Sequence, residues 1–313
     1  MPSEIKKAFL DELAKRFGSH KKLGDSQSFY EVGRGAARIY IRYSKLHYGK
    51  KTFYGLREVD LRKLDGHPSV ICFLWDGQPT PLLIPYSDYE QVFQSVEPAG
   101  DGQFKVQIYP QRQGTDLYIA NAGRFNVEAH FGWSALEALV GRAGRVRVPD
   151  LSHSQIQTLL GSIGTTKGFD VWVPTPDRAK LDWSIAAHFS CSECLPYGFE
   201  GVKRVLQEID VLWLERGSTQ ISALFEVEHS TPIYSGLLRL NDIHLVAPNL
   251  KPRFSIVAND ARRDVFVNQL NRPTFRLSGL SEMCSFLEYE NVFGWHTRIT
   301  SRGMHENVDS RSC

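Results

Sequence analysis

Hydrophobic residues in the second half of the chain follow two spacings that alternate along the sequence. In some segments they recur every three or four positions, which is typical of an amphipathic helix. In others they form short runs of Val, Ile, Leu and aromatics, which is typical of a strand. The expected order is a helix at 155–163, strands at 169–173, 209–214 and 223–228, a helix at 233–246, a strand at 254–258 and a helix at 262–270. This order predicts an α/β sandwich, with helices packed on a mixed sheet.

Helix-start and helix-stop residues bound two of these segments. Ser152 or Ser154 is expected to cap the first helix, because their hydroxyls can accept from free backbone N–H groups, and Gly164 is expected to end it. Ser230 or Thr231 is expected to cap the second helix in the same way.

The first half has a different pattern, with more strands and fewer helices. Basic residues and tyrosines alternate with Ile from Arg38 to Tyr43, and Gly49-Lys50-Lys51 indicates a turn, so we expect a hairpin that runs to Tyr54. The remaining expected elements are helices at 5–17, 59–64 and 133–140 and strands at 70–75, 82–85, 104–109 and 117–120. These elements predict a mixed α/β fold with a mainly antiparallel sheet (α+β).

A linker separates the two halves. The segment Gly141–Asp150 combines glycines, a proline and alternating arginines, which is the composition of a connection between domains. We therefore expect domains at 1–145 and 150–296. The polar segment 297–313 is predicted to be a flexible tail.

Three carboxylates are the most informative candidates for chemistry. Asp210 interrupts the apolar strand 209–214, and Glu226 and Glu228 lie on the next strand at the spacing that places both on one face. Gathered together, the three would repel one another unless a cation neutralised them, and Mg²⁺ prefers carboxylate oxygens. The alternative is that one or more of these acids lies on a solvated sheet face.

The order of elements, with Asp on the second strand and Glu-x-Glu on the third, resembles the PD-(D/E)xK nuclease superfamily, the core of many restriction endonucleases. The resemblance covers about residues 151–275. It implies an αβββαβ domain in which Asp210 and Glu226 bind Mg²⁺, with Mn²⁺ as a substitute. It also implies a third site residue, usually Lys, that orients or deprotonates the attacking water.

Glu228 stands at that third position, which is a departure from the usual Lys that some restriction enzymes share. A glutamate can bind a second metal ion or act as general base, but it supplies no positive charge. We therefore expect Arg239 or Lys203 to provide the missing cation. His229 points to the opposite strand face and is expected to be structural or to contact phosphate, and Gln157 could face the site from the first helix.

Charge is spread unevenly along the chain, although its net value is only +2. Residues 1–65 hold 15 Lys and Arg against 8 Asp and Glu, whereas residues 149–313 hold 16 against 19. A basic first domain suits a module that contacts a polyanion. The predicted phosphate contacts are Arg34, Arg38, Arg42, Lys45, Lys50 and Lys51, and the predicted base-stacking residues are Tyr43, Tyr48 and Tyr54.

Together these features predict a Mg²⁺-dependent endonuclease of restriction or defence type that hydrolyses double-stranded DNA, with sequence- or modification-specific recognition by the amino-terminal domain. Cutting both strands favours a homodimer, and a cognate DNA methyltransferase is a further conceivable partner. The alternatives are a DNA-binding protein that no longer cuts, and a module whose basic face meets an acidic protein.

Composition sets the broad class. Hydrophobic residues make up 42% and aromatics 12% of the chain, which is typical of a globular protein, and no apolar stretch reaches membrane-spanning length. The start also lacks the apolar core of a signal peptide, so a cytoplasmic location without membrane contact is expected. Cys191 and Cys194 form a lone C-x-x-C without the second pair that a zinc site needs.

Overall fold

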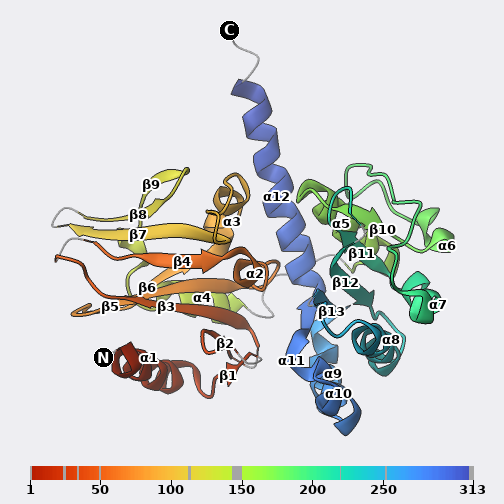
Figure 1. Cartoon of the computed structure of the whole chain (residues 1–313), viewed down its shortest axis with the longest axis horizontal. Coiled ribbons are helices and arrows are strands. Elements are labelled where there is room, and N and C mark those ends of the chain that lie inside the picture. Colours follow the sequence, from red (N-terminus) through yellow and green to blue (C-terminus); the bar gives the residue numbers. More distant parts are fainter. Residues whose placement is uncertain are drawn as a thin grey trace. The chain divides into compact units, whose positions relative to one another are not determined.

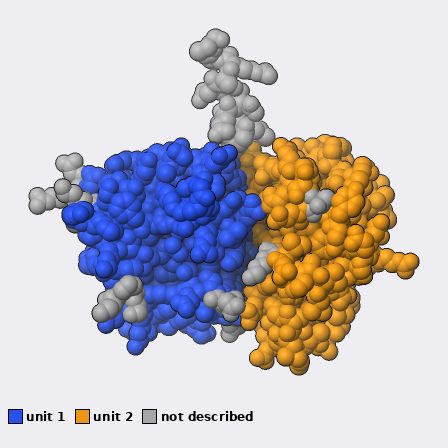
Figure 2. Space-filling view, in the orientation of Figure 1, with its two compact units in different colours: residues 1–146 blue, residues 147–313 orange. Residues whose placement is uncertain are grey.

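The chain folds into two compact units, residues 1–146 and 147–313 (Figures 1 and 2). The structure, a computed structural model, describes residues 2–309 other than 24–25, 34, 49–50, 112–113, 143–149, 219 and 251. The boundary between the units lies within the predicted linker, most of which is outside the described residues. Each unit has hydrophobic cores of its own.

The first unit contains two sheets. One has the strand order β1-β2-β3-β5-β6 and the other β4-β7-β8-β9. Its strands are β1 (Lys21–Lys22), β2 (Phe29–Val32), β3 (Ala37–Ser44), β4 (Tyr54–Arg57), β5 (Ser69–Trp75), β6 (Leu82–Pro85), β7 (Gln103–Gln111), β8 (Gly114–Ile119) and β9 (Gly123–Asn126). Its helices are α1 (Pro2–Phe17), α2 (Glu58–Leu61), α3 (Tyr86–Gln94), η1 (Glu128–His130) and α4 (Ser134–Arg142). Among the described strands of this unit, only β3 and β5 pair in parallel.

The predicted hairpin from Arg38 to Tyr54 is present only at its turn, where His47 and Lys51 form an antiparallel bridge, and its two strands do not pair with each other. Strand β3 pairs with β2 on one edge and with β5 on the other, whereas β4 pairs with β7 in the second sheet. The face predicted to be basic is also covered, because Tyr40 stacks on Phe29 with ring centroids 4.4 Å apart and is fully buried. A central strand needs apolar partners on both faces, and β3 is such a strand.

The second unit contains one sheet with the strand order β10-β11-β12-β13-β14. The first two pairings are antiparallel and the last two are parallel. Its strands are β10 (Asp170–Trp172), β11 (Val211–Leu214), β12 (Ile221–Val227), β13 (Arg253–Ala258) and β14 (Cys284–Glu288). Its helices are α5 (His153–Thr166), α6 (Thr175–Arg178), η2 (Glu200–Val202), α7 (Lys203–Gln207), α8 (Ile233–Val246), η3 (Asp260–Arg262), α9 (Arg263–Leu270), α10 (Pro273–Ser278), α11 (Leu280–Met283) and α12 (Tyr289–Asp309).

The predicted order of one helix, three strands, a helix, a strand and a helix is present in this unit as α5, β10, β11, β12, α8, β13 and α9. Apolar side chains on the two faces of the sheet enter two cores. Helix α8 contributes to one core, whereas α5 and α12 contribute to the other. The fold is thus a mixed α/β arrangement with helices packed on a sheet, as expected.

Helix α5 begins where the local sequence predicts, but it does not end at the predicted glycine. Ser152, one of the two predicted caps, caps the helix and forms a capping box with Gln155. Gly164 does not end it, because the helix continues to Thr166. Its missing side chain instead allows close packing, since a Cβ at Gly164 would lie 2.5 Å from Trp213 Nε1.

The prediction of a flexible tail from residue 297 is wrong as well. Helix α12 begins at Tyr289 and runs through this segment to Asp309 (Figure 1). Ile299 is only 4% exposed and lies in the same core as the fully buried Trp295. Polar composition hid two core positions because they are spaced four residues apart on a helix face. None of the described helices combines the length and apolarity needed to cross a membrane.

Candidate active site

The three predicted carboxylates lie together at one end of the sheet of the second unit. Asp210 immediately precedes β11, Glu226 is the last but one residue of β12, and Glu228 follows that strand. The two strands are antiparallel, so Asp210 lies opposite the end of β12, and its Oδ2 accepts a hydrogen bond from the backbone N of Val227 at 2.7 Å. Side-chain alternation in a strand then turns Glu226 away from Val227, toward helix α8.

Burial separates these residues from ordinary surface acids. Glu226 is 0% and Glu228 1% exposed, and the Asp210 side chain is 14% exposed. The alternative of a solvated sheet face is therefore wrong for the two glutamates. A buried carboxylate needs a charged partner or strong hydrogen bonds, since leaving it alone costs several kcal/mol.

Arg239 of α8 supplies that partner. Its Nε donates to Glu226 Oε1 at 2.8 Å and its Nη2 to Glu226 Oε2 at 2.7 Å, which is the two-pronged geometry of a strong guanidinium–carboxylate pair. The same Nη2 lies 3.7 Å from Glu228 Oε1. Of the two predicted cations, Arg239 therefore lies among the acids, whereas Lys203 is exposed at the start of α7.

The environment favours the protonated form of both glutamates. Burial raises the pKa of Glu226 well above its ordinary value, and the charges of Asp210 and Glu228 raise it further, while Arg239 opposes the shift. Burial also raises the pKa of Glu228, against a hydrogen bond from Thr231 and the charge of Arg239. The charges of the clustered acids thus add to burial in raising these pKa values, as expected of neighbouring carboxylates.

Helix α5 holds Asp210 through two residues one turn apart. His153 Nε2 lies 3.2 Å from Asp210 Oδ1, and Gln157 Nε2 donates to the backbone O of Asp210 at 3.2 Å. The bond to Asp210 raises the pKa of His153 against the effect of burial. Sequence reasoning considered Gln157 but missed His153. The signal was available, because a helix capped at Ser152 places residues 153 and 157 on one face.

The segment between β12 and α8 is fixed by Arg262. Its guanidinium donates to the backbone carbonyls of Glu228 and Thr231. The Thr231 hydroxyl donates to Glu228 Oε2, so neither it nor Ser230 is the predicted cap of α8, whose N-cap is Pro232 without a side-chain bond. His229 points away from the acids and approaches Tyr289, with 3.5 Å between Nδ1 and the hydroxyl, which agrees with a structural role.

Carboxylate oxygens of this kind suit a hard divalent cation. Glu228 Oε1 is buried and lacks a hydrogen-bond partner among the described residues. Gly236 of α8 makes the room around it, since a Cβ there would lie 2.5 Å from this oxygen. Within the part of the chain that the structure describes, however, no three His, Cys, Asp or Glu side chains are arranged to hold a metal ion. The donor chemistry fits Mg²⁺, and in the arrangement described Arg239 neutralises Glu226 instead.

The residues predicted to contact DNA in the first unit are divided by burial. Arg38 is 7% exposed, pairs with Glu31 at 3.1 Å and donates to the Lys63 carbonyl, and Tyr54 is 4% exposed with its hydroxyl on the Leu74 carbonyl. Both side chains are packed into the fold, which leaves little of either for contact with DNA. Arg38 lies on β3, an internal strand of its sheet, and the Tyr54 ring packs in a core against Phe73, with ring centroids 4.7 Å apart.

The other predicted contacts are less enclosed. Tyr48 is 95% exposed and Lys45 is exposed, whereas Arg42 and Tyr43 are partly buried, with the Tyr43 hydroxyl on Asp76 at 2.7 Å. Lys51 lies over the rings of Phe53 and Tyr109. Arg34 and Lys50 lie outside the described residues.

Comparison with known proteins finds a match to the region that contains Asp210, Glu226 and Glu228. The family model described as the type II restriction enzyme NmeDI C-terminal domain matches residues 145–310, just over half of the chain. The type II restriction enzyme NmeDI of Neisseria meningitidis serogroup C is 34% identical over 134 residues, which are 40% of this chain and 37% of that protein. The match thus spans little more than a third of this relative, and no solved structure matches. By its second unit, the chain belongs to the NmeDI C-terminal domain family of type II restriction enzymes.

Proposed function

We propose that this protein is a Mg²⁺-dependent endonuclease that hydrolyses phosphodiester bonds of double-stranded DNA. The observation that carries the proposal is the cluster of the buried Glu226 and Glu228 with the partly buried Asp210, inside the region that matches a restriction-enzyme domain. Gathering three acids at low exposure is unfavourable for stability. A site that retains them is therefore better explained by cation binding than by folding.

In this proposal Asp210 and Glu226 hold the metal ion, Mg²⁺ or Mn²⁺, and the domain is a PD-(D/E)xK-type αβββαβ core. The bound ion would neutralise charge on the phosphate and lower the pKa of an attacking water. Each Glu226 oxygen accepts one bond from Arg239, which leaves a lone pair on each oxygen for a cation. His153 and Gln157 keep Asp210 in place from α5.

Glu228 takes the position at which related nucleases carry Lys. We assign it the role of general base or of ligand to a second metal ion, since its Oε1 has no hydrogen-bond partner among the described residues and its raised pKa favours taking up a proton. Arg239, 3.7 Å from that oxygen, supplies the positive charge that Glu228 cannot. Both strands would be cut by a homodimer with two such sites, with the first unit selecting the sequence or modification state and a DNA methyltransferase protecting the host.

The second candidate is a DNA-binding protein that does not cut. The specific observation in its favour is the pairing of Glu226 with Arg239, which already neutralises one of the proposed metal ligands. This candidate predicts DNA affinity that is independent of Mg²⁺, and no cleavage under any condition.

The two candidates are separated by incubating supercoiled and linear duplex DNA with the full chain in Mg²⁺, in Mn²⁺ and in EDTA. Asp210→Ala should abolish cleavage while leaving DNA binding intact. Asp242→Ala, which removes an exposed carboxylate from α8, is the matched control and should cut normally. If the unaltered chain binds differently methylated DNAs but cleaves none of them, the result supports the second candidate. Equal cleavage by both variants would overturn the assignment of the site.

A further inference from the structure

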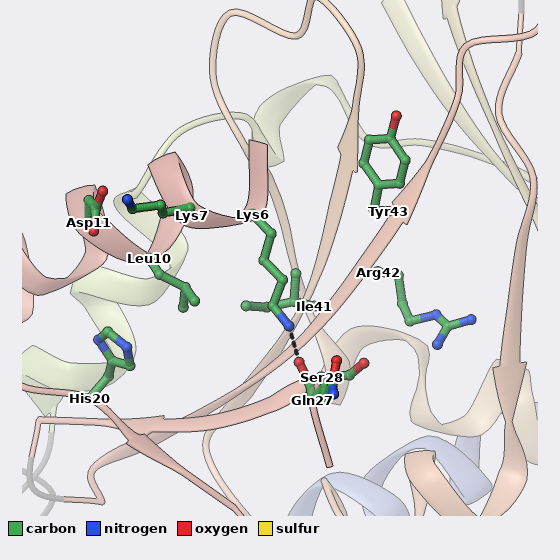
Figure 3. Close-up of a pocket in the computed structure, with 10 residues that line it drawn as sticks. All are labelled: Lys6, Lys7, Leu10, Asp11, His20, Gln27, Ser28, Ile41, Arg42 and Tyr43. Atoms are coloured by element: carbon green, nitrogen blue, oxygen red, sulfur yellow. Dashed lines mark hydrogen bonds between the residues drawn. The ribbon is translucent and has the colours of Figure 1, made fainter. Parts of the chain in front are cut away.

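The first unit contains a cavity of about 670 Å³ between helix α1 and strand β3 (Figure 3). Three separate parts of the chain line it: α1, the residues on either side of β1, and the outer half of β3. All of these lie within residues 1–146, so the cavity belongs to one unit. Its size exceeds that of a bare ion and falls in the range of ligand sites, about 300 to 1,000 Å³.

The charged residues of the lining are mainly basic. Lys6 and Lys7 come from α1 and Arg42 from β3, whereas Asp11 of α1 is acidic. His20 adds an imidazole ring. With three fixed cations against one carboxylate, the cavity is positively charged at neutral pH and favours an anionic ligand. Figure 3 shows Lys6 reaching across from α1 toward Gln27, whose carbonyl accepts its hydrogen bond.

Two buried nitrogens in this lining lack a hydrogen-bond partner among the described residues. They are Arg42 Nε and His20 Nδ1. A buried polar atom without a partner is unfavourable, and a ligand or water in the cavity would satisfy these two atoms. The Arg42 guanidinium is also held against the Tyr40 ring, 5.6 Å from its centroid, which limits its freedom before any ligand arrives.

We propose that this cavity binds the phosphate backbone of duplex DNA, with Lys7 and Arg42 as charged contacts to separate phosphates. The inference rests on the proposed function, because it takes duplex DNA as the partner. It goes beyond the sequence-based expectation by placing the contact on α1 as well as on β3. Lys7 is exposed and offers a charged amine to a phosphate, while the partly buried Arg42 offers several donors in a rigid plane.

The test is the salt dependence of DNA binding by the full chain. Fluorescence anisotropy with a labelled duplex, in EDTA so that no cleavage occurs, gives the dissociation constant at several salt concentrations. Each phosphate contact removed lowers the slope of log K against log salt by about 0.9. Lys7→Gln and Arg42→Gln should each reduce the slope by about that amount and weaken binding to all sequences alike. Lys15→Gln is the matched control, since Lys15 is an exposed lysine of the same helix outside the cavity lining.

The outcomes are distinct. Unchanged slopes in both cavity variants, or a loss no larger than that of Lys15→Gln, would overturn the proposal. A competing titration with a deoxynucleoside 5′-monophosphate tests whether the cavity binds a free nucleotide instead of DNA. If the cavity variants lose affinity for the monophosphate but keep their DNA slope, the ligand is a free nucleotide and the DNA assignment is wrong. Cleavage of DNA by the unaltered chain in Mg²⁺, measured in parallel, shows whether the proposed function stands when the cavity assignment fails.

Discussion

Replacing Arg239 by Met should destabilise the second unit in a manner that depends on pH. The substitution keeps an apolar stem of similar length but removes both hydrogen bonds to Glu226, at 2.8 and 2.7 Å. Glu226 would then remain fully buried next to two other acids, with no cation in contact. Removing one partner of a buried ion pair costs about 3–5 kcal/mol. Because the Arg239 side chain is 28% exposed and partly screened by solvent, we expect a loss near the lower end, about 3 kcal/mol at pH 8.

The pH dependence follows from the direction of the pKa shift. Burial raises the pKa of Glu226 above its unfolded value, and Arg239 opposes that rise, so removing Arg239 raises it further. A carboxyl group with a raised folded pKa binds protons more tightly in the folded state, so stability falls as pH rises from about 4.5 through the folded pKa. The variant should therefore lose less than half as much stability at pH 5 as at pH 8.

The assay is urea unfolding at both pH values, followed by amide hydrogen exchange in peptides from β12 and α8. These peptides report the second unit alone, which matters because a chain with two units need not unfold in one step. Arg276→Met removes an exposed arginine of the same unit and should change stability by no more than about 0.5 kcal/mol. Glu226→Gln added to the first variant should recover at least half of the loss. An equal loss at pH 5 and pH 8, or no recovery in the double variant, would refute this account of the pair.

Three other substitutions test separate parts of the structure. Gly236→Ala should lower the free energy of unfolding in urea by about 1–3 kcal/mol, because its Cβ would lie 2.5 Å from Glu228 Oε1. The control Gly294→Ala, whose Cβ would meet its nearest atom at 3.5 Å, should be neutral or more stable by up to about 1 kcal/mol. The reverse order of stabilities would contradict the packing of α8. His153→Phe should reduce cleavage about 10- to 100-fold without abolishing DNA binding, as measured by initial rates, since its ring positions Asp210. The stability lost in that variant should be largest below pH 6.5 and vanish as pH rises through the raised folded pKa of His153, so a loss that grows with pH would be inconsistent with the bond to Asp210. Ile299→Ala should cost about 2–4 kcal/mol by thermal or urea unfolding, whereas a flexible tail would show no change.

Local sequence patterns predicted four of the five described strands of the second unit and its helices α5, α8 and α9, but neither β14 nor α10 to α12. The helix expected at 233–246 has those bounds, and the strands at 169–173, 209–214, 223–228 and 254–258 each overlap a strand of the structure. Apolar spacing works well here because each element buries one face, or both, against neighbours that are close in the sequence. The same alternation indicated that Glu226 and Glu228 share a face, and the apolar run around Asp210 marked that residue as unusual.

Prediction failed where long-range pairing or packing decides the outcome. Residues 38–54 have the local pattern of a hairpin, but β3 finds partners in β2 and β5 instead. Gly164 has the local character of a helix end, yet it lies inside α5 because Trp213 packs against it. Thr297 begins a polar segment, but Ile299 within it packs into a core. Propensity is a weak preference in each case, and tertiary packing overrides it.

The sequence by itself indicated four strands and three helices of the second unit and the three acids that matter, because these depend on side-chain periodicity within short segments. Only the tertiary structure decided what surrounds those acids. The sequence left Arg239 and Lys203 as alternative cations, and it did not identify His153. Arg239 lies 13 residues beyond Glu226, and His153 lies 57 residues before Asp210. Their ion pair and hydrogen bond arise because α8 and α5 pack near the same end of one sheet, where low exposure makes each charge depend on its neighbours.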